Sequence, residues 1–249
     1  MIKEYLKSFS IFFGGWTLAM IVFLVFGSFG DVFVFILDWI IPAVILGCLG
    51  IILASFYRKV NVKSNNIRWL VILLLIIIDQ GSKIKLFSMD YMTMNIPLIE
   101  PSFYLRPIQN THGSYFASLL NLDVPKFLYF ILYIIISFLF FKAYRFYVKK
   151  KQNSIWLKSF ITLFISGVLC VAIDNGYWGG SLDFIFINPL YIFDIKDIYL
   201  TSAILCLVVE LYNNKLLFNS NISKEREKEL RKEFIRFIFN EKKTHSDKK

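Results

Sequence analysis

The sequence is poor in the residues that build metal centres and disulfide frameworks, with only three cysteines and two histidines among 249 residues. Cys48, Cys170 and Cys206 all lie within apolar runs and show neither pairing nor metal-ligand spacing, so we interpret them as small buried hydrophobic residues. His112 lies in a loop segment without ligand partners nearby in the sequence. A disulfide framework and a metal centre are therefore both disfavoured.

Internal repeats and low-complexity tracts are also absent, and apolar sequence fills the chain instead. Hydrophobic residues make up 57% of the chain, the mean hydropathy is +0.58, and the apolar residues come in long blocks rather than at amphipathic spacing. This pattern excludes an ordinary soluble domain and predicts membrane helices, each near the ~20 residues that cross a bilayer core. We expect six of them, at about 9–27, 33–56, 67–87, 127–147, 155–174 and 195–214.

The net charge of +10 could indicate a nucleic-acid partner, but the positions of the basic residues favour another explanation. In a six-span arrangement with both termini inside, all but five of the 28 lysines and arginines fall on one side of the membrane. The exceptions are Lys83, Lys85, Arg106, Lys126 and Lys196. The positive-inside rule therefore predicts cytoplasmic termini, with segments 88–125 and 175–194 on the outer face, and no nucleic-acid partner.

We expect three parts along the chain, which together form an all-α polytopic membrane protein with six transmembrane helices and a small extracytoplasmic β platform. Residues 1–65 form a transmembrane hairpin, residues 66–216 form the core, and residues 217–249 form a basic cytoplasmic tail. The platform includes a short strand at 101–107, whose extent is limited by proline at both ends. Ser223 can cap an amphipathic tail helix that lies either on anionic lipid or in water.

Two aspartates lie at the edges of the last two apolar runs, where a charged side chain is costly and usually marks function or a water-filled cavity. Asp183 and Asp197 bracket one short aromatic loop, with Asn188-Pro189 as its turn former. Two close carboxylates cannot both ionise cheaply, so one would keep a proton while the other acts as a base. The alternative is that both side chains only cap or orient a loop.

Five stretches, taken in order, resemble the motifs of signal peptidase II, the bacterial prolipoprotein signal peptidase. Asp79-Gln-Gly-Ser-Lys83 fits Asp-Gln-x-x-Lys, and Phe103-Tyr-Leu105 leads to Asn110-Thr-His-Gly-Ser-Tyr-Phe116, which is similar to Asn-x-Gly-x-Ala-Phe. Cys170-Val-Ala-Ile-Asp-Asn175 partly matches Gly-Asn-x-x-Asp-Arg, Ser181-Leu-Asp-Phe184 matches Val-Val-Asp-Phe, and Phe193-Asp-Ile-Lys-Asp197 matches Phe-Asn-x-Ala-Asp. The resemblance covers about residues 67–214 and leaves out the N-terminal hairpin, because the family core has four spans.

The resemblance implies a membrane aspartic endopeptidase of the bacterial cytoplasmic (inner) membrane, in which Asp183 and Asp197 activate water on the outer face. Its substrate would be a lipid-modified prolipoprotein, cut just before the diacylglyceryl-cysteine. No metal or organic cofactor is implied, and membrane lipids are the other expected partners. Two alternatives stay open. One is a catalytically inactive relative that binds lipidated peptides or a membrane partner. The other is a small ion-coupled transporter, although transporters usually show an internal symmetry that this chain lacks.

Further residues of these motifs are expected to bind or orient the substrate. They are Asp79, Lys83, Asn110, Asp174, Asn175 and Asp194. By the resemblance, Asp174 supports the site, and Asn110 either hydrogen-bonds substrate backbone or makes its own turn. The chain departs from the family pattern near the pair, with Asn175 in place of Arg, Cys170-Val171 in place of Gly-Asn, and Asp194 in place of Asn. These departures favour either an altered substrate preference or a loss of cleavage.

Overall fold

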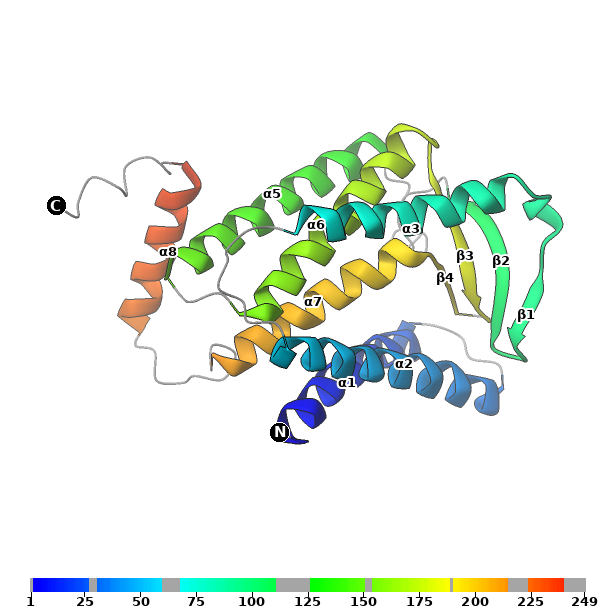
Figure 1. Cartoon of the computed structure of the whole chain (residues 1–249), viewed down its shortest axis with the longest axis horizontal. Helices are drawn as coiled ribbons and strands as arrows, with labels where there is room; N and C mark the ends of the chain where they lie inside the picture. The colour runs from blue at the N-terminus through cyan, green and yellow to red at the C-terminus, as the bar shows by residue number, and fades with distance from the viewer. Residues whose placement is uncertain are drawn as a thin grey trace.

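The computed structural model describes residues 2–26, 31–59, 68–110, 126–150, 154–188, 190–214 and 224–239. Its helices are α1 (Ile2–Phe26), α2 (Val32–Lys59), α3 (Trp69–Phe87), η1 (Tyr91–Thr93), α5 (Lys126–Lys150), α6 (Ile155–Gly176), α7 (Ile195–Asn213) and α8 (Lys224–Phe239). Its strands are β1 (Ile96–Ile99), β2 (Phe103–Asn110), β3 (Ser181–Ile187) and β4 (Tyr191–Phe193). A helix lies at each predicted span, so the predicted class, a mostly helical polytopic protein with a small sheet, is confirmed (Figure 1). His112 and Ser223 lie outside the described residues.

Within the described residues, four helices are long and apolar enough to cross a membrane by length and composition alone. They are Ile2–Val25, Val32–Ser55, Ile131–Lys149 and Ile155–Gly176. The 19-residue helices α3 and α7 each hold three charged residues and are not among these four, so their crossing of the membrane stays a prediction.

The distribution of side chains around α3 is the reverse of that in a soluble helix. Asp79, Gln80 and Lys83 are buried, whereas Leu70 is 83% exposed. Several other apolar residues of α3 are exposed as well, among them Leu73, Leu74, Ile77 and Ile78. Polar residues that face the protein interior while apolar residues face outward are typical of a membrane helix that contributes to a functional site.

The four strands form one antiparallel sheet in the order β1-β2-β3-β4, at the end of the molecule opposite α8 (Figure 1). The sequence predicts a short aromatic loop before the last span, but the structure has the β3–β4 hairpin there. Strand β3 pairs with β2, and β4 leads into α7. The predicted limit at Pro107 is wrong, because β2 continues to Asn110. The register of β2 against β3 shifts between Leu105 and Ile108, and such an irregularity accommodates a proline that cannot donate a ladder hydrogen bond.

The N-terminal hairpin packs through small residues. A side chain added at Gly50 of α2 would place its Cβ 2.8 Å from the carbonyl oxygen of Ser8 on α1, so the backbones of the two helices approach closely only because glycine stands there. The indole nitrogen of Trp16 also donates to the carbonyl oxygen of Asp38, at 3.1 Å. On its other side α1 contacts α7, where Gly15 lies against Leu205. The hairpin is thereby docked on the helix that begins at the candidate site.

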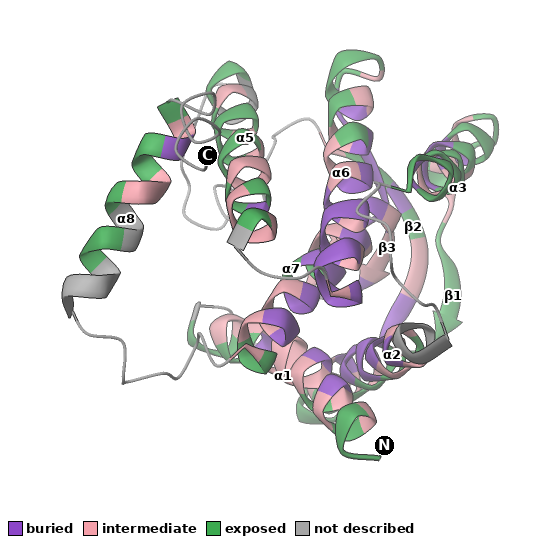
Figure 2. Ribbon diagram, turned by 60° about the vertical axis from the view of Figure 1, so that its left-hand side comes forward, coloured by how far each residue is buried: buried purple, intermediate pink, exposed green. Residues whose placement is uncertain are grey.

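Buried residues concentrate on α6, α7 and the facing side of the hairpin, whereas α5 is mostly exposed or intermediate (Figure 2). The tail helix α8 packs on α5, with the rings of Phe234 and Phe237 centred 5.3 Å and 5.6 Å from that of Phe146. Phe237 is only 3% exposed. The apolar face of the tail, which the sequence assigned to lipid or water, therefore lies in part against another helix.

Candidate active site

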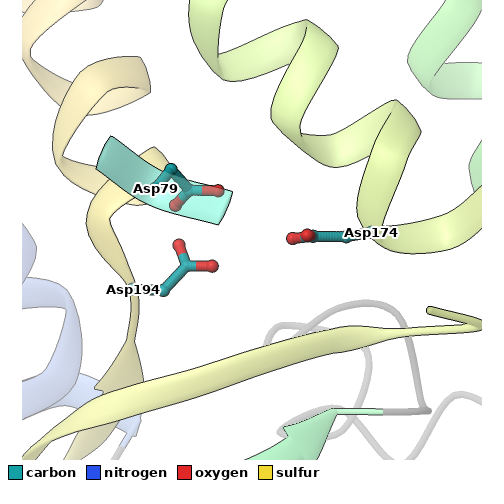
Figure 3. Close-up of side chains that lie close together, drawn as sticks. All are labelled: Asp79, Asp174 and Asp194. Atoms are coloured by element: carbon teal, nitrogen blue, oxygen red, sulfur yellow. The ribbon is translucent and has the colours of Figure 1, made fainter. Parts of the chain in front are cut away.

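The candidate site lies where the sheet meets the ends of α6 and α7 and the polar face of α3. Asp79 and Lys83 come from α3, Asp174 from the last turn of α6, and Asp194 from the residue just before α7. All four side chains are fully buried. Figure 3 shows the three carboxylates, from segments far apart in the sequence, pointing toward one another.

The ammonium group of Lys83 lies at the centre of this cluster. Its Nζ atom is 2.9 Å from Asp79 Oδ2, 2.7 Å from Asp174 Oδ2 and 2.7 Å from Asp194 Oδ2. One oxygen from each of the three acids lies within 4.8 Å of the others, which is a spacing that could hold a metal ion. The lysine supplies positive charge between them, so these acids are neutralised in part by the chain itself. Removing one partner of such a buried pair is strongly destabilising, because it leaves an uncompensated charge.

A glutamine that the sequence analysis did not single out joins α3 to α6. Gln80 donates to Asp79 at 3.0 Å and to Asp174 at 2.9 Å, and its side-chain oxygen accepts a hydrogen bond from the indole of Trp178 at 3.1 Å. Trp178 in turn stacks on Phe87, with the ring centroids 5.0 Å apart. Gln80 therefore orients two carboxylates of the cluster and is held in place by an aromatic side chain.

The start of α7 is fixed by a reciprocal capping box. Asp194 accepts a hydrogen bond from the backbone nitrogen of Asp197 at 3.2 Å, and Asp197 Oδ2 accepts from the backbone nitrogen of Asp194 at 3.2 Å. Asp79 Oδ1 accepts from the backbone nitrogen of Lys196 at 3.0 Å, so three backbone N–H groups at the start of α7 donate to carboxylates. Burial raises the pKa of Asp194, but the ammonium groups of Lys196 and Lys83 outweigh it and hold that pKa below its ordinary range.

Asp183 is positioned by the pairing of β2 with β3. The register places Asn110 opposite Ser181, two residues before Asp183. Asn110 Nδ2 donates to Asp183 Oδ2 at 3.0 Å, and Ser181 Oγ donates to Asp183 Oδ1 at 2.7 Å. Asn110 thus contacts the aspartate directly, which neither of the two roles expected for it had specified. Asp183 is 7% exposed.

The structure brings Asp183 and Asp197 together. One carboxylate oxygen of each, and one of Asp194, lie within 4.8 Å of one another. Asp197 is half-buried in the first turn of α7, and Asp183 lies at the start of β3 on the other arm of the hairpin. The turn at Asn188 closes this hairpin, with the backbone nitrogen of Leu190 donating to Ile187 at 2.7 Å. The two acids therefore meet because β3, β4 and the capping box return the chain to the same place.

A second lysine, which the sequence analysis missed, lies beside this pair. Lys196 Nζ is 3.6 Å from Asp183 Oδ1, 3.2 Å from Asp174 Oδ2 and 2.6 Å from Ser181 Oγ, and it forms a short contact with Asp194. It stands where the family motif has alanine, two residues after the position where Asp194 replaces asparagine, and it is one of the few basic residues on the predicted outer side. Those two departures, taken together, were the signal that could have found it.

One expected site residue is not brought into the cluster. Asn175 is exposed, and its side-chain nitrogen donates to the carbonyl oxygen of Val171, one turn earlier in its own helix, at 2.9 Å. The other expected residues all lie in one connected network of polar groups, in which Asn110 and Asp197 are half-buried and the rest are buried. They are Asp79, Lys83, Asn110, Asp174, Asp183, Asp194 and Asp197.

A mostly helical protein with apolar spans and a buried carboxylate cluster beside a small sheet is a polytopic membrane protein with a polar site, and the comparisons identify its family. The family model for signal peptidase (SPase) II matches residues 71–213. Two proteins named lipoprotein signal peptidase, from Streptococcus agalactiae serotypes Ia and III, are each 32% identical over 158 residues, covering 61% of this chain and 96% of their own length.

The chain therefore belongs to the signal peptidase II family, and the predicted family resemblance is confirmed. Membership of this family implies a protease that processes lipoproteins at a bacterial membrane. Two solved structures described as bacterial membrane enzymes, at 2.3 Å and 1.9 Å resolution, are 20% and 24% identical, each with a TM-score of 0.46. The match to the first covers 62% of this chain and 93% of the other chain, and the match to the second covers 57% and 90%.

Proposed function

We propose that the chain is an aspartic endopeptidase that removes signal peptides from lipid-modified prolipoproteins, with Asp183 and Asp197 as its catalytic pair. The observation that carries this proposal is the separation of their carboxylate oxygens, which is within 4.8 Å although the residues come from β3 and α7. Ionising both carboxylates at such a separation would be costly, so one of them would keep a proton. The reaction needs only water and no cofactor.

The chemistry follows from the shared proton. The ionised carboxylate takes a proton from water, whose oxygen attacks the scissile carbonyl carbon, while the protonated carboxyl hydrogen-bonds to the carbonyl oxygen. The tetrahedral intermediate then collapses as the C–N bond breaks. The proton passes to the leaving amine, which is the α-amino group of the lipid-bearing cysteine. The hydrogen bonds from Asn110 and Ser181 hold Asp183 in one orientation during these steps.

A lipid-bearing substrate fits the position of the pair. The sheet and the start of α7, which carry Asp183 and Asp197, lie at one end of the helical part, whereas the basic C-terminal end of α5 and the helix α8 lie at the other (Figure 1). The positive-inside rule puts the basic end in the cytoplasm, which would place both termini inside and the pair on the outer face. Acyl chains can then stay in the bilayer while the scissile bond reaches water.

The proposal predicts that Asp183→Asn and Asp197→Asn each abolish most cleavage. Each change removes an acid or a base at nearly constant shape, and such groups typically contribute ~10²–10⁴-fold. The assay is cleavage of a diacylglyceryl-modified precursor by the purified protein in lipid. Asp90→Asn is the matched control, because Asp90 is exposed on the same predicted side and its side chain bonds only to Thr93 among the described residues.

Two outcomes would contradict this function: no cleavage of several lipidated precursors by the wild-type protein, or full cleavage by both aspartate variants. The first would favour an inactive relative that binds lipidated peptides. One observation points in that direction, because the capping box and Lys196 satisfy the carboxylates without a substrate. Nothing in the family match favours a transporter.

A further inference from the structure

Lys196 is a charged group beside Asp183 that the mechanism above does not use. Its side chain is almost fully buried, and its ammonium contacts three carboxylates and a hydroxyl. The other buried lysine of the cluster, Lys83, is engaged by Asp79, Asp174 and Asp194. Among the residues that the structure describes, Lys196 is therefore the only cation with an ion pair to Asp183.

The short distance from Lys196 to Ser181 suggests a serine–lysine nucleophile, but the charges argue against it. A lysine that activates a serine must be neutral, and desolvation alone would favour that form. Here the ammonium lies against Asp174, Asp183 and Asp194, which all favour the charged form. Lys196 therefore acts as a fixed positive charge rather than as a base.

The donors around the two catalytic aspartates are unequal. Asp183 receives hydrogen bonds from Asn110 and Ser181 and an ion pair from Lys196, all of which favour its ionised form. Asp197 receives a backbone N–H at 3.2 Å, and its charged neighbours include Lys196 as well as the carboxylates of Asp183 and Asp194. Of the two catalytic aspartates, Asp183 is the one with which Lys196 forms an ion pair in the described part of the chain. The titratable groups that face the pair and Lys196 are Asp79 and Lys83 on α3, Tyr133 on α5, Asp174 on α6, Tyr191 on β4, and Asp194.

We propose that Lys196 is a positioning residue whose ammonium keeps Asp183 ionised, so that Asp183 is the base and Asp197 carries the shared proton. This inference rests on the proposed function for its mechanistic meaning, but the charge relation itself belongs to the folded protein. It also explains why Asp194 and Lys196 occur together: the added carboxylate and the added ammonium neutralise each other inside the site.

The first test is the protonation of Asp183, followed without cleavage. The protein is labelled with ¹³C at aspartate carboxyls, the Asp183 signal is assigned from the spectrum of Asp183→Asn, and the pH is varied from about 4 to about 8. We expect Lys196→Met to raise the protonation midpoint of Asp183 by ~1–2 pH units, since an ion pair at this distance typically has that effect. Lys196→Arg, which keeps the charge, and Lys85→Met, which removes an exposed lysine of α3, should leave it unchanged.

The second test is the pH profile of cleavage. In Lys196→Met the acidic limb of kcat/KM should move to higher pH by a similar amount, and Lys196→Arg should restore it. A loss of activity that is uniform across the pH range, together with an unchanged Asp183 midpoint, would show a merely structural lysine and overturn the inference. A shifted midpoint in a protein that cleaves nothing would support the inference while contradicting the proposed function.

Lys196→Met leaves Asp194 without one of its two lysines and could impair folding. In that case the comparison is made between Asp194→Asn and the double variant Asp194→Asn/Lys196→Met. Both lack the added carboxylate, and they differ only in the lysine. A higher Asp183 midpoint in the double variant supports the inference, and equal midpoints overturn it.

Discussion

Asp194 acts both as the N-cap of α7 and as a counter-ion of two buried lysines. The two roles can be separated by chemistry, because asparagine caps a helix about as well as aspartate but carries no charge. Any decrease in the free energy of unfolding of Asp194→Asn therefore measures the contribution of the ion pairs rather than that of the cap. The same substitution returns the position to the residue of the family motif while Lys196 remains.

We predict that the difference in unfolding free energy between the wild-type protein and Asp194→Asn, the stability gap, depends on pH. The folded pKa of Asp194 lies below its unfolded value, so its contribution is complete above about pH 5 and is lost as the pH falls through the folded pKa. Charged hydrogen bonds of this kind are worth about 1.5–3 kcal/mol, so the gap at neutral pH should be of that order.

The measurement is the melting temperature of the purified proteins in detergent across this pH range. Glu100→Gln is the control, because Glu100 is exposed in the turn after β1 and its removal should change little at any pH. A gap for Asp194→Asn that stays constant down to the lowest pH would mean that its charge does not contribute.

At the scale of the elements, the N-terminal hairpin depends on the close approach of α1 and α2. Phe12 of α1 is fully buried, and its ring lies 3.0 Å from where a Cβ at Gly50 would be. The carbonyl oxygen of Ser8 is nearer still and belongs to the backbone, which cannot move aside as a side chain would. Gly14, by contrast, has open space around it, with nothing within 4 Å of an added Cβ.

We predict that Gly50→Ala destabilises the protein by roughly 1–3 kcal/mol, the usual cost of overpacking a tight contact. Gly14→Ala should be neutral or slightly stabilising, since alanine is the better helix former. Thermal unfolding of both variants in detergent provides the comparison. Equal melting temperatures for the two would show that the helices do not pack as closely as the structure has them.

At the scale of the whole molecule, charge and shape agree on one orientation. The helix ends rich in lysine and arginine, including the end of α5 and all of α8, lie away from the sheet (Figure 1). Lys85 and Arg106 lie near the sheet, but the two lysines of the site are outnumbered there by its five carboxylates. The orientation proposed from the positive-inside rule therefore does not conflict with the lysines at the site.

We predict that cysteines placed at Ser88 and Tyr177 react with a membrane-impermeant thiol reagent in intact cells, and that one placed at Lys228 does not. All three positions are exposed, so access is decided by the side of the membrane. The background lacks Cys48, Cys170 and Cys206. Labelling at Lys228 alone would invert the orientation and place the catalytic pair in the cytoplasm.

Much of this arrangement could be predicted from the sequence, because its causes are local. A run of apolar residues long enough to cross a bilayer becomes a helix in any context, since its backbone groups must be satisfied within the segment. The sequence thus determined the positions of α1, α2, α5 and α6. It also determined the family, through short motifs in order, and it singled out Asp183 and Asp197 because acids next to apolar runs are costly.

Only the tertiary structure decided how the site is assembled, because its contacts join residues that no local pattern connects. Asn110 and Asp183 are 73 residues apart and meet through the pairing of β2 with β3, and Asp79 accepts from the backbone of Lys196 across 117 residues. Nor could spacing show that Lys196 turns inward to three carboxylates while Asn175 turns away from them. The direction of a side chain at a helix end depends on which charges the fold brings opposite to it, and that is a property of the folded molecule alone.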